Sequence, residues 1–373
     1  MKFSKLAKVA VVATVSLALA VPTLTSASAA SKFATATSAS QAGGLAGLAA
    51  GCKAEGQLNV IALPHYWADY GTMIDKFKAA YGVKVDEADP EGSSQDEIDA
   101  ANRLKGTNRS PDVFDVGLAV AGKYLGTGTF APYKVRNWAN NLGTSAVPSG
   151  EYTPNYTGTM TIGYDGSLGT ITKLDDLLKP VFKGKVTING DPLGSSAGMN
   201  SIYMVNAALG GTFDDVSPAV AWFKKLKAAG NYINVNPTEA TIASGQTPVV
   251  MDNGYIAAGI AKKFAAAGKS WKTFTPASVG STYNSAVSAW APHPACARLW
   301  MEFTLGETGA AIWAGGGATP TLWTWMLKTG RAPAAGIAVI GKSKVAAAAA
   351  TAAQTAKARE YLKTAWPAAV GVK

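Results

Sequence analysis

The pattern of apolar positions switches between strand and helix periodicity in the first half of the chain. Residues 57–63 are almost continuously apolar, as in a buried strand, and residues 83–88 and 113–116 predict two more strands. After the first strand, apolar side chains recur at helical spacing, at Tyr70, Met73, Ile74, Phe77 and Tyr81. With a further helix over residues 95–104, this order predicts a mostly parallel sheet covered by helices.

A second block of alternating elements starts near residues 185–189. Its clearest helix is capped by Ser217, has Pro218 in the first turn and stops at Gly230. The side chains predicted to face inward along this helix are Ala219, Trp222, Phe223 and Leu226. Residues 248–251 predict another strand, so the second block is also of the α/β type.

Two segments rich in Gly, Thr and Tyr, residues 156–166 and 281–291, connect these blocks. Two crossings between two α/β blocks are what a hinged protein of two lobes requires. We therefore assign residues 55–160 to the first part of lobe 1 and residues 161–285 to lobe 2. Residues 286–373 are predicted to return to lobe 1 and to end in helices, the last of them rich in Ala.

The first 29 residues have the three parts of a secretory signal peptide. A basic start is followed by an apolar stretch over residues 9–21 and by the small residues Ala27 and Ala29 at a cleavage site. The alternative, an uncleaved N-terminal anchor, would need a longer apolar stretch to cross a membrane. We therefore expect an exported protein in the periplasm or at the outer cell surface.

Residues 30–54 are rich in Ser, Ala and Gly and are predicted to be a flexible leader. Cys52 ends a motif similar to a lipoprotein attachment site, but such a motif must directly follow the apolar stretch, so no lipid is expected. In an oxidising compartment the two cysteines, Cys52 and Cys296, favour a disulfide. The alternative is that Cys296 is simply buried, because Cys296, Leu299, Trp300 and Phe303 follow helical spacing.

Composition narrows the classes of function. The chain has 373 residues, of which 48 % are hydrophobic and 16 % charged, so it can bury a large core in two lobes. Two His and two Cys leave little for a metal cluster, and no cofactor is expected. The formal charge of +10 would fall to +7 without the three lysines of the signal peptide. The basic residues of the chain, such as Lys224, Lys225 and Lys227, are not interleaved with aromatic residues, so no nucleic-acid partner is expected.

Ligands of doubly wound sheets bind where strands end and helices begin, and five such junctions stand out. The first follows the opening strand and contains Tyr66, Trp67 and Asp69. Aromatic faces beside a carboxylate suit an organic cation. The alternative interpretation is that the rings pack on the sheet edge and Asp69 begins the helix.

The other four junctions combine hydroxyls, acids and one more aromatic ring. Hydroxyls at helix starts can hold a polar or anionic group, although ordinary helix capping explains Ser93 and Ser94 equally well. For any single junction, a simple turn is the alternative interpretation. The candidate ligand-binding residues at these four junctions are Ser93, Ser94, Asp115, Asp191, Ser195, Ser196, Asp252 and Tyr255.

One alternative of another class is a secreted serine hydrolase. Residues 194–198 match the pattern G-x-S-x-G, and Asp252 and His293 follow Ser196 in the order of that fold. A nucleophilic serine should stand at the immediate end of a strand, whereas residues 190–195 intervene after the predicted strand. His293 lies between two prolines at a helix start, so this alternative is the weaker one.

Several segments, in order along the chain, resemble the extracellular solute-binding proteins of ABC importers. Residues 55–60 resemble the start of the mature family proteins, and residues 110–116 resemble the family's "PDV-D" strand. Residues 174–186 look like the family's "DLL-P-(Y/F)KGKV" element, followed by Asn189-Gly190-Asp191-Pro192. Residues 291–309 resemble the helix that ends in "S-E-G". The similarity extends over residues 55–330.

The resemblance implies a type II fold of two lobes, each a mostly parallel sheet flanked by helices, that close on a small solute. It also implies a monomer that delivers its solute to a membrane permease and has no catalytic activity. The nearest subgroup comprises binders of polyamines, ferric ions and phosphonates. Tyr203 stands alone where ferric binders have a Tyr-Tyr pair, and Asp252-Asn253-Gly254-Tyr255 replaces a Trp-Asp-Tyr-like run.

Acids and aromatics outnumber Arg at the five junctions, which favours a cationic, polyamine-like solute enclosed by Tyr66, Trp67 and Tyr255. An anionic phosphonate or carboxylate, or a chelated metal, is the alternative within the same class. A purely structural cell-surface protein would bind no ligand and would not close.

Overall fold

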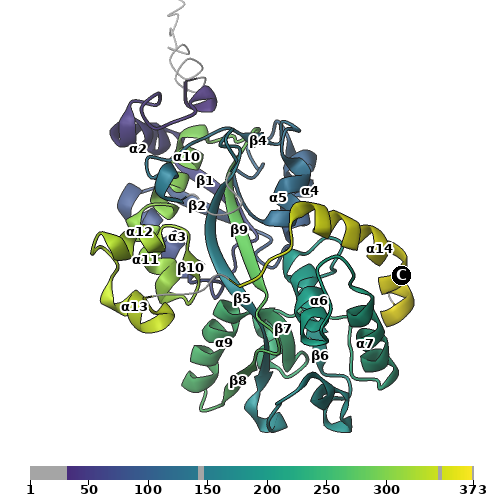
Figure 1. The fold of residues 1–373 in the computed structure, drawn as a ribbon. Helices are drawn as coiled ribbons and strands as arrows, with labels where there is room; N and C mark the ends of the chain where they lie inside the picture. Colours follow the sequence, from purple (N-terminus) through teal and green to yellow (C-terminus); the bar gives the residue numbers. More distant parts are fainter. Residues whose placement is uncertain (1–31, 142–146, 343–346, 372–373) are drawn as a thin grey trace, which may run out of the picture.

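The structure is a computed structural model that describes residues 32–141, 147–342 and 347–371. Two lobes lie one above the other and are connected by two long strands, β5 (Thr153–Asp165) and β9 (Gly280–Ser288) (Figure 1). The predicted signal peptide lies outside the described residues. No helix among the described residues is long and apolar enough to cross a membrane.

Lobe 1 contains the first strands and the helices that cover them. Its helix α3 (Tyr70–Tyr81) buries the apolar face predicted from its spacing and ends at Gly82, whose φ of 65° suits glycine. The remaining elements before the first crossing are α2 (Gly44–Glu55), β1 (Gln57–Ile61), β2 (Lys84–Ala88), α4 (Ser94–Leu104), β3 (Val113–Gly117), α5 (Leu118–Tyr124), β4 (Phe130–Ala131) and η1 (Trp138–Asn141). After the second crossing, lobe 1 adds α10 (Pro294–Thr304), α11 (Glu307–Gly315), β10 (Thr319–Pro320), α12 (Trp323–Lys328) and α13 (Ala334–Ile340).

Lobe 2 is built between the two crossings. Its core contains the apolar face of α7 (Ser217–Ala228), with Trp222, Phe223 and Leu226 buried. Its other elements before the return crossing are η2 (Gly166–Leu168), η3 (Leu174–Leu178), η4 (Pro180–Phe182), β6 (Val186–Ile188), α6 (Ser196–Ala208), α8 (Glu239–Ala243), β7 (Val249–Asn253), α9 (Gly254–Ala266) and β8 (Trp271–Phe274).

The larger sheet is mixed, whereas the sequence predicts mostly parallel sheets. β1 pairs with β2 in parallel, and β6 pairs with β7 in parallel. The long strands β5 and β9 run between the lobes in opposite directions, so each of their ladders is antiparallel. The strand order of the larger sheet is β3-β9-β5-β7-β6, which makes one sheet continuous through both lobes. The α/β class is confirmed.

The C-terminal helix α14 (Ala352–Val370) belongs to lobe 2, whereas the sequence places the end of the chain with lobe 1. Leu362 and Trp366 are buried in the lobe 2 core, and the Trp366 ring lies 5.0 Å from that of Phe223. The N-terminal end of α14 lies near α5 of lobe 1 (Figure 1). The apolar face of α14 holds the helix in this position, because it covers a side of α7 that the rest of lobe 2 leaves uncovered.

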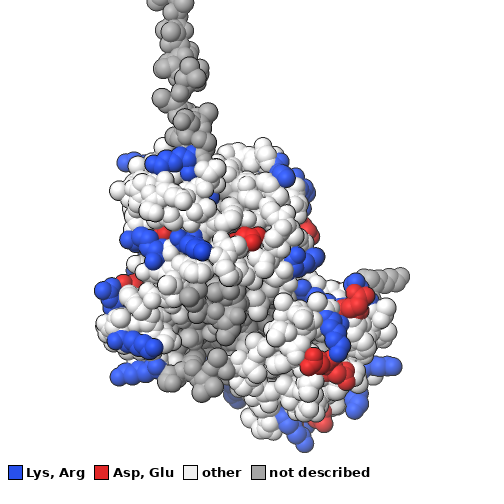
Figure 2. Space-filling model, turned by 45° about the horizontal axis from the view of Figure 1, so that its top comes forward, with Lys and Arg blue, Asp and Glu red and all other residues white. Residues whose placement is uncertain are grey.

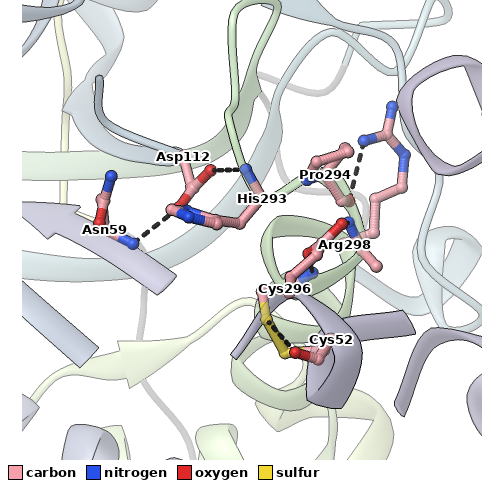
Figure 3. The surroundings of a disulfide bond; sticks show 9 residues. Cys52, Asn59, Asp112, His293, Pro294, Cys296 and Arg298 are labelled. Atoms are coloured by element: carbon pink, nitrogen blue, oxygen red, sulfur yellow. Dashed lines mark hydrogen bonds and ion pairs between the residues drawn. A yellow bond between two sulfur atoms is a disulfide. The ribbon is translucent and has the colours of Figure 1, made fainter. Parts of the chain in front are cut away.

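The predicted flexible leader is instead folded onto lobe 1. Helix α2 buries Leu48 and packs against α10, and Cys52 forms a disulfide with Cys296 across 244 residues of sequence. The carboxylate of Glu55 accepts hydrogen bonds from the backbone N–H groups of Ala295 and Cys296 at the start of α10. These contacts hold the segment against the lobe despite its Gly- and Ala-rich composition (Figure 3).

Candidate functional site

A cavity of about 590 Å³ lies between the lobes and is lined by both of them. Lobe 1 contributes the N-terminal turn of α4, the segment that follows β1, and side chains within β3 and β9. Lobe 2 contributes the segment between β6 and α6 and the polar segment of residues 234–236. The lining residues include Trp67, Glu91, Ser93, Ser94, Asp96, Glu97, Asp115, Asn189, Asp191, Ser195, Asn234, Asn236 and Tyr283.

The lobe 1 wall is organised by the start of α4. Ser93 caps this helix in a capping box with Asp96, which turns the first helical turn toward the cavity. Behind it, the Ser94 hydroxyl accepts a hydrogen bond from the Gly117 backbone N–H at 3.1 Å. The buried carboxylate of Glu97 accepts one from the Asp115 backbone N–H at 2.9 Å. The helix start and the end of β3 are thus fixed to each other.

Asp115 is a buried carboxylate at the edge of the cavity. Its two oxygens accept hydrogen bonds from the Asn155 side-chain amide at 2.5 Å and the Tyr156 hydroxyl at 2.6 Å. Burial raises the pKa of Asp115 to about 6, although these hydrogen bonds oppose the rise. Burial, and then the neighbouring Asp115 charge, raise the pKa of Glu97 well above its ordinary value. Two neighbouring buried acids therefore lie here, and within the described residues neither forms an ion pair with a Lys, Arg or His.

Aromatic rings cover the base of the cavity. The Trp67 indole N–H donates to the Tyr156 hydroxyl at 3.1 Å, and its ring meets Tyr283 edge to face at 5.4 Å. The rings of Tyr156 and Tyr283 are stacked, with centroids 5.5 Å apart. Because Trp67, Tyr156 and Asp115 are connected by hydrogen bonds, the rings and the acid are positioned together.

The lobe 2 wall is a polar turn that leads into α6. The Ser195 hydroxyl donates to the Asn189 carbonyl at 2.7 Å and accepts from the Gly198 N–H at 3.0 Å, which caps α6. Asp191 is exposed, and one of its carboxylate oxygens accepts from the Leu193 N–H at 2.8 Å. Asn189 donates to the buried Asp252 at 2.7 Å. This wall offers amide and carboxylate oxygens to a ligand.

The cavity lining is acidic in a protein whose formal charge is +10. Five carboxylates line it, from Glu91, Asp96, Glu97, Asp115 and Asp191. Among the described residues, no Lys, Arg or His lines this cavity. On the face drawn in Figure 2, the Lys and Arg side chains are scattered over both lobes and interspersed with acids. Within the described residues, the space between the lobes thus combines several acids with no lining cation.

The structure brings six of the predicted site residues to this cavity. They are Trp67, Ser93, Ser94, Asp115, Asp191 and Ser195. Tyr66 and Asp69 instead line a separate opening of about 220 Å³ with His65 and Lys263. The reason is local geometry, because consecutive residues of the turn after β1 point to different sides. Tyr66 still touches the wall indirectly, since its hydroxyl donates to Glu91 at 2.9 Å.

Three other predicted residues lie behind the walls. Asp252 is buried and accepts from Asn189 at 2.7 Å and from the Asn253 N–H at 2.7 Å. Burial raises the pKa of Asp252 to about 7. Tyr255 is buried with its ring 6.0 Å from that of Trp67. Ser196 is buried against Gly117 and lines a pocket of only about 30 Å³. These residues support the walls rather than line the cavity.

The hydrolase arrangement is not assembled. The His293 ring nitrogen Nδ1 and backbone N–H contact the two Asp112 oxygens at 2.8 Å and 2.7 Å, beside the disulfide (Figure 3). Asp252 is paired with asparagines, and the Ser196 hydroxyl has no hydrogen-bond partner among the described residues. His293 is the N-cap residue of α10, and this position holds its side chain away from Ser196. No base therefore activates this serine.

Several lining residues are not predicted from the sequence. Asn189 is predicted only as part of a turn. No local sequence pattern marks Asn234, Asn236, Glu97 or Tyr283 as ligand-binding residues. Glu97 lies one turn into a predicted helix, where an acid normally faces solvent. Tyr283 lies within a predicted crossing, and the alternation of side chains along a strand would place it on one face.

No group of three or more His, Cys, Asp or Glu side chains among the described residues could hold a metal ion. The chemistry of the cavity is instead that of reversible binding. It combines fixed hydrogen-bond acceptors, a few hydroxyl groups and aromatic faces between two lobes, without an activated nucleophile.

The model of a family described as bacterial extracellular solute-binding protein matches residues 108–336. The chain belongs to this family. It is therefore a solute-binding protein of the kind that serves ABC importers, and it is exported. The family consists of binding proteins, not enzymes. No curated protein matches this solute-binding protein in sequence.

Solved structures with the same fold are all distant in sequence. AgtB from A. tumefaciens, in complex with agropinic acid, is 16 % identical with a TM-score of 0.61, and the match covers 85 % of this chain and 99 % of AgtB. AfuA from Actinobacillus pleuropneumoniae, with fructose-6-phosphate, is 16 % identical with a TM-score of 0.60 and the same two coverages. A periplasmic thiamin-binding protein is 16 % identical with a TM-score of 0.60, covering 84 % of this chain and 96 % of its own. These structures establish the two-lobed type II fold.

Proposed function

We propose that this solute-binding protein captures a small organic cation, of polyamine-like character, between its lobes and delivers it to a membrane permease. The observation that carries the proposal is the acidic lining of the cavity. Five carboxylates face a space with no lining Lys, Arg or His among the described residues. Glu97 and Asp115 are buried, and burying two neighbouring carboxylates costs free energy unless a cation compensates them.

The position of each acid supports a protonated amine as the compensating group. In lobe 1 a Glu97 oxygen accepts a hydrogen bond from the Asp115 backbone N–H, and Asp191 lines the cavity from lobe 2. An ammonium group donates up to three hydrogen bonds and would be accepted by carboxylate and amide oxygens from both lobes. The faces of Trp67 and Tyr283 would cover the aliphatic or cationic part of the solute.

One observation favours the anionic alternative. Helix α6 begins at the cavity without an acid in its first turn, and such a helix start binds anions. The second helix start, that of α4, has Asp96 and Glu97 in its first turn and would repel an anion. The cavity has five lining carboxylates and only the start of α6 favours an anion, so the cation remains the proposed ligand.

A thermal-shift panel tests the proposal. The mature protein, refolded after denaturation to remove bound solute, is heated with spermidine, putrescine, thiamine, citrate, phosphonates and sugars. A solute at 100 times its Kd adds about 2.7 kcal/mol of stability and raises Tm by several degrees. We expect shifts from organic cations only. Shifts confined to phosphonates or carboxylates would overturn the charge of the ligand while leaving the solute-binding role intact.

A further inference from the structure

Gly117 and Ser196 meet across the boundary between the lobes, beside the cavity. Gly117 is the last residue of β3 in lobe 1, and Ser196 is the first residue of α6 in lobe 2. A Cβ atom on Gly117 would overlap both the Cβ and the Oγ of Ser196. The lobes therefore approach at this point as closely as two backbones with one small side chain between them allow.

Both sides of this contact are held rigidly. The Gly117 N–H is bound by the Ser94 hydroxyl at 3.1 Å, and Gly117 lies opposite Tyr283 in the β3–β9 ladder. Ser196 is fixed at the start of α6, which the Ser195 side chain caps. The Ser196 hydroxyl is buried and has no hydrogen-bond partner in the described part of the chain. The contact is thus steric, with no hydrogen bond from the Ser196 hydroxyl to hold the two residues together.

A second glycine makes a similar approach on the other flank of the crossing strands, where α9 lies opposite α6 (Figure 1). A Cβ atom on Gly259 of α9 would lie 2.7 Å from the Tyr66 carbonyl oxygen of lobe 1. Contacts below 3.0 Å require the backbone to move. Both flanks of the hinge therefore include a position where an added side chain would overlap the other lobe.

We propose that the contact between Gly117 and Ser196 is the stop that limits closure of the lobes, and that the missing side chain at residue 117 sets the width of the ligand cavity. Asp115 lies two residues before Gly117, and Ser195 directly precedes Ser196. Any side chain at residue 117 would separate the acids of lobe 1 from the oxygens of lobe 2. This inference goes beyond the proposed function and is independent of the charge of the solute.

The protein offers a reporter of closure that needs no ligand. A Cβ atom on Gly194 of lobe 2 would lie 3.7 Å from the Gln95 Cβ of lobe 1, within the range of disulfide-bonded cysteines. The native cysteines are already paired and no free cysteine exists in the described residues. The double variant Gly194→Cys/Gln95→Cys should therefore cross-link on mild oxidation whenever the lobes reach the arrangement described here. Peptide mapping without reduction measures the rate.

The stop is tested by adding Gly117 variants to this reporter. We expect Gly117→Val to slow cross-linking by roughly tenfold or more, and Gly117→Ala to slow it less, because the added atoms overlap α6. Adding Ser196→Gly to Gly117→Ala should restore the original rate. Gly122→Ala is the matched control, since its Cβ atom would be 3.5 Å from that of Ala352, an ordinary contact.

Two results would overturn the inference. The first is an unchanged rate in Gly117→Val and Gly117→Ala, with circular dichroism showing that both are folded. The second is a reporter pair that fails to cross-link in the otherwise native protein, which would mean that the lobes do not meet at residue 117. Either result leaves the thermal-shift test of the cationic solute unaffected, because no solute is present in the cross-linking experiment.

Discussion

At the scale of single residues, Asp115 is a lining acid whose charge changes close to neutral pH. Its pKa is raised to about 6 by burial, so the free carboxylate is mostly ionised at pH 7 and mostly protonated at pH 5. Proton loss creates the negative charge that would pair with an ammonium group. The Tyr156 hydroxyl and the Asn155 amide hold the ionised oxygens in place.

We therefore expect affinity for an organic cation to fall by about tenfold between pH 7 and pH 5, following the protonation of Asp115. The sign is fixed because protonation removes an acceptor charge, while a polyamine stays fully protonated over this range. Isothermal titration at four pH values measures the effect. Asp115→Asn should bind more weakly and lose most of the pH dependence. An affinity that rises toward pH 5 would contradict the assignment.

At the scale of elements, α14 completes the core of lobe 2. Trp366 is 1 % exposed and its ring contacts those of Phe223 and Tyr232, whereas Tyr361 of the same helix is 43 % exposed. The helix begins with a capping box formed by Thr351 and Gln354. Local capping and burial therefore both determine where this helix lies.

Trp366→Ala should lower the free energy of unfolding by about 3–5 kcal/mol, because it leaves a large cavity in lobe 2. Tyr361→Ala is the matched control on the same helix and should cost less than about 1 kcal/mol. Urea unfolding followed by circular dichroism measures both. Equal, small losses in the two variants would mean that α14 is not part of the lobe 2 core.

Elements with a strong periodic pattern could be predicted from the sequence, and others could not. The apolar spacing of α3 and the Ser-Pro start and Gly stop of α7 locate both helices. Helix α2 has no such pattern, because its Ala and Gly residues resemble a linker, and it is ordered by the contacts of Cys52 and Glu55 with α10. The antiparallel ladders of β5 and β9 depend on pairing between distant segments, which local pattern does not encode.

The candidate site shows the same division. Trp67, Asp115 and Ser195 were predictable because the sequence places them at or after strand ends, where the fold class places ligands, although Asp115 lies in the middle of β3. Asp69 follows the same rule but points away, since a turn has two sides and the sequence does not specify which side a residue takes. Glu97 and Tyr283 reach the cavity only because α4 and β9 are packed as they are.

At the scale of the whole molecule, the larger sheet runs through both lobes and the cavity lies where they face each other. Because β5 and β9 are shared, a hinge movement along them would change the separation of the two walls without disturbing either core. The acids of lobe 1 and the oxygens of lobe 2 then act on one solute only when the lobes are together.

The most direct test of the cationic assignment is isothermal titration calorimetry of the cation that gives the largest thermal shift. The comparison is between the native protein, the double variant Glu97→Gln/Asp115→Asn, and Asp75→Asn, which removes an exposed acid of α3 outside the cavity. We predict one bound cation per chain, affinity lowered at least about tenfold in the double variant, and no change in Asp75→Asn. Equal affinity in all three proteins would contradict the claim that the cavity acids bind the solute.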